Sequence, residues 1–103
     1  MQTHIVTLAE VAAELRPSLA EVLQAYGRAV ILTMGRHVGC DAATARGVDI
    51  VCSSARDRYQ LIGLAIDHGI KRIGLYPGWV HLDAEPALPH PCLWVGTRAG
   101  GDG

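Results

Sequence analysis

The chain has 103 residues, of which 50% are hydrophobic and 18% are charged, and its formal net charge is −1. This composition excludes a disordered chain, and no apolar run approaches the ~20 residues that cross a bilayer, so a membrane span is excluded as well. The balanced charge offers no field for a phosphate backbone, and nucleic acid is therefore not an expected partner. We expect one soluble domain over residues 1–96 and a flexible tail over residues 97–103.

The first third of the chain predicts two short helices and a strand. Apolar residues recur at helical spacing over residues 8–15, and the pattern restarts at Pro17 and runs to residue 26. Gly27 predicts the end of the second helix. Residues 29–33 form a β-branched apolar run between glycines, which is typical of a buried strand.

The middle of the chain predicts a loop, a strand and a helix. Residues 35–46 show no periodicity, and a loop of that length often carries function. Residues 47–52 predict a strand, after which Ser54 and Asp57 occupy the two positions of a capping box. Gly69 predicts the end of that helix. The face that we expect to turn to the core carries Tyr59, Ile62, Ala65 and Ile66.

Three short strands are predicted to follow, over residues 72–76, 79–83 and 92–95. Pro77-Gly78 separates the first two by two residues, which favours a tight reversal and an antiparallel hairpin. The order of the elements predicts an α+β fold: a small antiparallel sheet with N-terminal helices and one central helix.

Strand alternation places chemistry-bearing side chains on one face of this sheet. In the strand over residues 47–52, the β-branched side chains share the core face and leave Asp49 on the opposite one. In the strand over residues 79–83, the same alternation leaves Trp79, His81 and Asp83 on that opposite face. Asp and His are zinc ligands, and a carboxylate beside a metal-bound water is a candidate base. The alternative is that a sheet with one solvated face carries polar residues there in any case.

The segment from Arg46 to Ile50, the helix after it and residues 69–83 resemble the M15 family of zinc peptidoglycan peptidases. That family includes D-Ala-D-Ala carboxypeptidases and phage endolysin domains, and it shares the fold of the Hedgehog signalling domain. The resemblance runs from the strand at residue 29 to the strand that contains Trp94, and it is most specific over residues 72–83. It implies zinc held by the His and the Asp of a Ser-x-His-x-x-Gly-x-Ala-x-Asp motif and by a His on a later strand.

In that comparison Asp49 matches the motif's Asp, His81 the later His, and Asp83 the acidic residue of the family's His-x-Asp strand. The position of the motif's His is occupied by Ala42, whose methyl group cannot bind zinc.

Three explanations of Ala42 remain open. The loop bends so that His37, or else Cys40 or Asp41, supplies the missing ligand. Alternatively, the site has decayed and leaves a metal-free module that still binds a cell-wall peptide. In the third explanation, Ala42 is an engineered His-to-Ala change that silences the enzyme.

The general base departs from the family pattern as well. Other branches of the family place a carboxylate three residues before the later His, where this chain has Gly78. Asp83 is then the candidate catalytic base, or it orients His81 from beside the metal. Arg36, in a Gly-x-Arg turn after the first strand, matches the family's anchor for a substrate carboxylate, with a solvated loop arginine as the alternative. Trp79 is a candidate wall of a substrate groove.

The resemblance implies a zinc-dependent peptidase that hydrolyses an amide bond in peptidoglycan stem peptides, with Zn²⁺ as cofactor and Asp49, His81 and His37 as ligands. Ala42 and Gly78 favour the alternative of a catalytically inactive binding or structural module of a phage or cell wall. A third hypothesis is an interaction domain in which a closed four-ligand zinc shell only supports the fold. The chain's start lacks the pattern of a secretory signal, so we expect cytoplasmic synthesis and phage-mediated or lysis-linked delivery to the wall.

Overall fold

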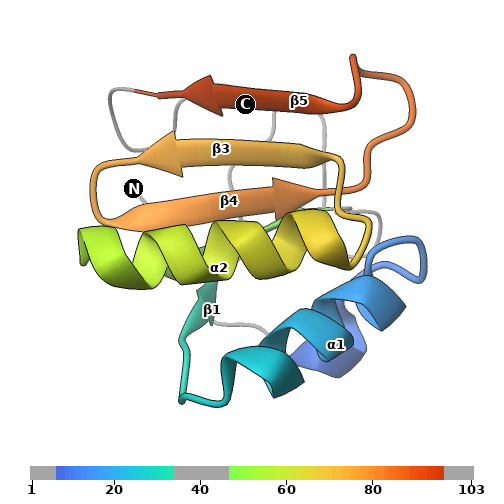
Figure 1. Cartoon of the computed structure of the whole chain (residues 1–103). Helices are drawn as coiled ribbons and strands as arrows, with labels where there is room; N and C mark the ends of the chain where they lie inside the picture. The colour runs from blue at the N-terminus through green and yellow to red at the C-terminus, as the bar shows by residue number, and fades with distance from the viewer. Residues whose placement is uncertain (1–6, 34–46, 97–103) are drawn as a thin grey trace.

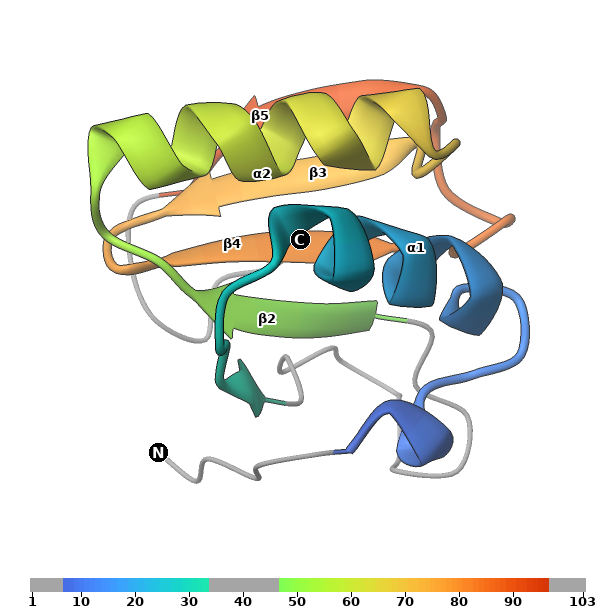
Figure 2. The same cartoon turned by 60° about the horizontal axis from the view of Figure 1, so that its bottom comes forward.

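Two helices lie on one face of a five-stranded open sheet in the structure, a computed structural model that describes residues 7–33 and 47–96 (Figures 1 and 2). The helices are α1 (Arg16–Tyr26) and α2 (Ala55–Asp67). The sheet has the strand order β1-β2-β4-β3-β5, with the strands β1 (Leu32–Thr33), β2 (Gly47–Val51), β3 (Arg72–Tyr76), β4 (Trp79–Asp83) and β5 (Cys92–Val95). The expected loop over residues 35–46 and the expected tail over residues 97–103 lie outside the described residues.

The predicted α+β class and the bounds of the last three strands are confirmed, but the sheet is mixed rather than antiparallel. β3 and β4 form the expected antiparallel hairpin, in which Tyr76 pairs with Trp79. β5 pairs with β3 in parallel. The chain leaves β4 at the end of the sheet where β3 begins, and β5 starts from that same end on the far side of β3. The two neighbours therefore run in the same direction.

The expected first helix over residues 8–15 is wrong, because only the single 3₁₀ turn Leu8–Glu10 forms there. Thr7 and Glu10 close a capping box over this turn, and the backbone is already extended at Val11 (ψ 141°). The Arg16 side chain then donates two hydrogen bonds to the Val11 carbonyl, at 3.1 and 2.9 Å. The second helix is confirmed as α1, which ends at Gly27 in the left-handed conformation (φ 73°).

The ends of α2 follow the predicted signals. The Ser54 side chain accepts a hydrogen bond from the Asp57 N–H, and Gly69 takes a positive φ of 85° beyond the C-cap. The first strand is shorter than the predicted residues 29–33: β1 consists of Leu32 and Thr33, and before it the Ile31 carbonyl accepts one hydrogen bond from the Val51 N–H of β2.

The core lies between the helices and the sheet, and strand alternation is confirmed there. Val48, Ile50, Val80 and Leu82 are all buried on the helix side of β2 and β4.

The predicted core face of α2 is confirmed only in part: Ala65 lies in the core and Ile62 packs against it, but the buried face is rotated away from Tyr59 and Ile66. Leu61 and Ala65 are fully buried, whereas Tyr59 is 84% and Ile66 is 60% exposed. The neighbouring helix accounts for the rotation, because α1 packs against α2 and the buried arc that meets α1 and the sheet carries Leu61 and Ala65. Arg28, just beyond α1, adds solvent-exposed hydrogen bonds to Asp57 and Gln60 of α2.

Candidate functional site

Four charged side chains form a continuous row on the face of the sheet that lies away from the helices. The register pairs Asp49 with His81 across β2 and β4, and Arg72 with Asp83 across β3 and β4. His81 Nδ1 lies 2.8 Å from Asp49 Oδ1, and His81 Nε2 lies 2.7 Å from Asp83 Oδ2. Arg72 Nε donates to Asp83 Oδ1 at 2.8 Å. We call Asp49, His81, Asp83 and Arg72 the polar row.

The polar row is buried at one end and open at the other. Arg72, His81 and Asp83 are 3%, 3% and 2% exposed, whereas the Asp49 side chain is 17% exposed. Buried charges are tolerated when each meets an opposite charge with good hydrogen-bond geometry, and the row alternates in sign along its length. Asp49 is therefore the member of the row that solvent reaches most readily.

The hydrogen bonds of His81 indicate that its ring is positively charged in this arrangement. An ionised carboxylate only accepts hydrogen bonds and a neutral imidazole has one N–H, so two carboxylates on the two ring nitrogens require both to carry protons. Burial opposes this charge, but the hydrogen bonds to Asp49 and Asp83 outweigh it and raise the pKa of His81. Burial alone would raise the pKa of Asp83, yet the bonds from His81 and the Glu85 N–H and the charge of Arg72 lower it.

The surroundings of Asp83 bear on its two predicted roles. Its Oδ1 accepts hydrogen bonds from Arg72 Nε and from the Glu85 backbone N–H, and its Oδ2 binds His81. A general base must reach the proton that it removes, directly or through one water. With both oxygens engaged and the residue buried, the geometry favours Asp83 as the residue that orients His81 over Asp83 as the catalytic base.

Arg72 is a member of the row that strand alternation within β4 alone does not reveal. Its guanidinium also donates from Nη1 to the Pro89 carbonyl at 2.6 Å and lies 4.7 Å from the ring centroid of Trp94. The hairpin predicts its place in the row from the sequence. A two-residue Pro-Gly turn pairs residue 76 with residue 79, and the antiparallel register then pairs residue 72 with residue 83. Arg72 thus links the row to the connection between β4 and β5.

Aromatic side chains lie beside the polar row on the same face of the sheet. Trp79, the predicted groove residue, is half-buried and stacks on Tyr76 with ring centroids 5.0 Å apart. Trp94 also lies on this polar face, with its ring centroid 5.7 Å from that of His81 and its Nε1 donating to Tyr76 Oη. Gly74 makes this placement fit, since a Cβ there would lie 2.6 Å from the Trp94 ring.

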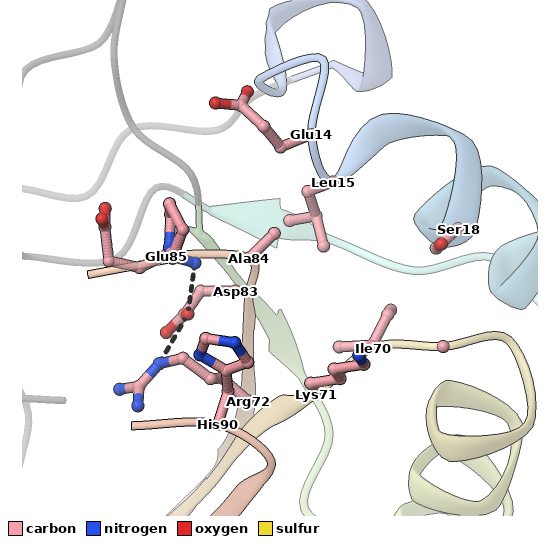
Figure 3. Close-up of a pocket in the computed structure, with 12 residues that line it drawn as sticks. Glu14, Leu15, Ser18, Ile70, Lys71, Arg72, Asp83, Ala84, Glu85 and His90 are labelled. Atoms are coloured by element: carbon pink, nitrogen blue, oxygen red, sulfur yellow. Dashed lines mark hydrogen bonds and ion pairs between the residues drawn. The ribbon is translucent and has the colours of Figure 1, made fainter. Parts of the chain in front are cut away.

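A cavity of about 250 Å³ lies at the end of the sheet where the buried end of the row is found (Figure 3). Arg72 and Asp83 form part of its wall, next to His90 from the β4–β5 connection and Leu15 from the segment before α1 (Figure 3). Asp83, which binds His81, and its partner Arg72 thus border a space large enough for a small ligand group.

The residues that the structure describes fit a zinc ion in part. Asp49 and His81 bring a carboxylate oxygen and an imidazole nitrogen together, and both are zinc donors. No cluster of three or more candidate metal ligands occurs within residues 7–33 and 47–96. The predicted third ligand His37, its alternatives Cys40 and Asp41, and the predicted anchor Arg36 all lie outside these ranges.

Comparisons with protein-family models, with curated proteins and with solved structures found no match for this chain. Among the described residues, no helix has the length and apolar character that crossing a membrane requires.

Proposed function

We propose that the chain is a zinc-dependent peptidase-like domain that hydrolyses an amide bond in peptidoglycan stem peptides, like the M15 peptidases that it resembles. One observation carries the proposal. Asp49 and His81, the two positions that match metal ligands of that family, come from different strands 32 residues apart and lie side by side at 2.8 Å.

The arrangement of His81 suits a metal ligand whose ring is oriented by a hydrogen bond from its second nitrogen to Asp83. Asp83 accepts from Nε2 and so keeps a proton on that nitrogen, which leaves Nδ1 as the atom that would bind zinc once its own proton is lost. The Asp49 carboxylate, the most exposed member of the row, would supply a second zinc donor beside it. A bound zinc ion would polarise the scissile carbonyl and lower the pKa of a water molecule.

The remaining roles follow from the resemblance and from the aromatic side chains beside the polar row. His37 would supply the third ligand, and Arg36 would bind the substrate's carboxylate. Trp79, stacked on Tyr76 at the edge of the polar face, would offer a flat apolar surface to the peptide.

The charge balance of the polar row favours a second candidate, a catalytically inactive binding module on the same fold. With His81 protonated, the row satisfies its own charges and the fold needs no metal ion. Metal content therefore separates the two candidates.

The test is elemental analysis of the purified chain after incubation with excess zinc and removal of unbound metal. We expect close to one zinc per chain, and loss of zinc together with hydrolysis of a stem peptide in Asp49→Asn and His81→Gln. Asp57→Asn and His68→Gln, at opposite ends of α2, are the matched controls and should keep both properties. Absence of zinc from the wild-type chain would overturn the proposed peptidase and leave the inactive binding module. His37→Ala tests the proposed third ligand and should lower the zinc content.

A further inference from the structure

β5 is an open edge of the sheet whose outward peptide groups have no hydrogen-bond partner in the described part of the chain. Cys92 N–H donates to the Lys71 carbonyl at 2.7 Å, and Gly96 N–H donates to the Leu75 carbonyl at 2.8 Å. Because peptide groups alternate in direction along a strand, those of Leu93 and Val95 point away from β3.

The same two residues expose apolar side chains on the helix side of the sheet. Leu93 is 57% and Val95 is 74% exposed, while their neighbour Trp94 faces the polar row. Natural edge strands are usually protected by lysine, proline or a covering element, and the segment Cys92–Val95 contains neither residue.

α2 extends this apolar surface above the edge. Tyr59 and Ile66 lie about 200° around the helix from Asp57 and His68, which contact Arg28 and Glu21. Figure 2 shows α2 on the side of the sheet towards β5 and α1 on the side towards β2. Tyr59 and Ile66 therefore face the open edge. We call Tyr59, Ile66, Leu93 and Val95 the edge patch.

We propose that the edge patch binds a second copy of this chain, with the two β5 strands paired antiparallel about a two-fold axis near Trp94. Leu93 would lie opposite Val95 of the partner subunit, and each such pair exchanges both of its N–H···O bonds. The axis generates the second pair, and a single sheet then continues through both subunits.

A second copy fits this surface because the edge patch is complementary to itself after a two-fold rotation. The two-fold axis reverses α2, so Tyr59 points towards Ile66 of the partner subunit, and an uncharged patch brings no like charges together. On the other face, Trp94 would meet Trp94 of the partner subunit as an aromatic pair. A bound peptide would pair with β5 alone and leave Tyr59 and Ile66 in water, whereas a second copy covers them.

The size of the patch sets the strength of the dimer. One short strand edge and four side chains make a small interface, which we expect to bury less than the ~800 Å² per subunit of a standard one. We therefore expect weak association, with a Kd on the order of 10 µM. The dimer does not depend on zinc or on the proposed activity.

The experiment is sedimentation equilibrium of the full chain from about 1 to 500 µM, a range that brackets this Kd. Val95→Pro removes an outward N–H that no acceptor among the described residues uses, and proline is tolerated at such edge positions, so the monomer should fold while the Kd rises at least about 10-fold. Leu93→Lys should act likewise. Leu88→Lys, at an exposed apolar residue outside the patch, is the matched control and should leave the Kd unchanged.

Amide hydrogen exchange locates the contact. We expect the Leu93 and Val95 amides to exchange more slowly at high than at low protein concentration. A chain that stays monomeric up to about 500 µM would overturn the proposal, as would a dimer that persists in both Val95→Pro and Leu93→Lys. Slow exchange of these amides in the monomer would also overturn it, since another segment would then occupy the edge.

Discussion

Replacing Arg72 by methionine should leave the Asp83 carboxylate buried without its permanent cationic partner. The two side chains are 4% and 1% exposed, and Nε lies 2.8 Å from Oδ1. Methionine keeps much of the aliphatic stem beside Trp94, so the substitution mainly removes the charge and its hydrogen bonds. It also removes the donor to the Pro89 carbonyl.

The expected cost follows from these contacts. Removing one partner of a buried ion pair typically costs about 3–5 kcal/mol, and His81 remains to offset part of it, so the lower end applies. Loss of the bond to Pro89 adds about 1 kcal/mol. We expect the free energy of unfolding to fall by about 4 kcal/mol, a large share of the ~5–15 kcal/mol of a small domain, and Tm to fall by roughly 15–30 °C.

Urea unfolding at pH 7, followed by far-ultraviolet circular dichroism, measures this loss. Arg28→Met is the matched control, because its pair with Asp57 is solvent-exposed and screened, and this variant should unfold close to the wild-type midpoint. Adding Asp83→Asn to Arg72→Met removes the stranded charge and should recover part of the loss. Equal midpoints for Arg72→Met and Arg28→Met would refute the reasoning.

Four further predictions concern stability and are measured by urea unfolding of the metal-free chain. The raised pKa of His81 contributes stability that is fully present below about pH 6.5 and is lost as the pH rises through the folded-state pKa, a slope that His81→Gln should remove. The lowered pKa of Asp83 contributes stability that is present above about pH 3.8 and lost as the pH falls through its folded-state pKa. Gly74→Ala should displace the Trp94 ring, cost about 1–3 kcal/mol and change tryptophan fluorescence, and an unchanged emission spectrum would contradict the close contact. Ser54→Ala should cost about 1 kcal/mol through the lost cap of α2, and an unchanged midpoint would contradict it.

Local signals account for the parts of the fold that the sequence predicts well. Ser54, Gly69 and the Pro77-Gly78 turn act within a few residues of their own positions, so the bounds of α2, β3 and β4 follow from them. The parallel placement of β5 depends on where an eight-residue connection returns to the sheet. No spacing within the chain encodes that long-range choice.

The candidate site divides in the same way. Alternation within β2 and β4 places Asp49, His81 and Asp83 on one face, and the register then sets their contacts. The register of the β3–β4 hairpin also predicts that Arg72 lies opposite Asp83. The predicted third ligand, His37, lies outside the described residues and stays a prediction.

The exposure of Tyr59 and Ile66, which were predicted to face the core, has a physical explanation that bears on the proposed dimer. Apolar residues occupy two arcs of the helix, one with Leu61 and Ala65 and one with Tyr59 and Ile66. Helical periodicity detects side chains that gain by leaving water, but it does not distinguish the domain's own core from a contact with another molecule. In this structure the core takes the first arc because α1 packs alongside it. The second arc keeps the same driving force without a partner in the described part of the chain, and it lies above the β5 edge of the sheet, whose outward peptide groups are also unpaired there.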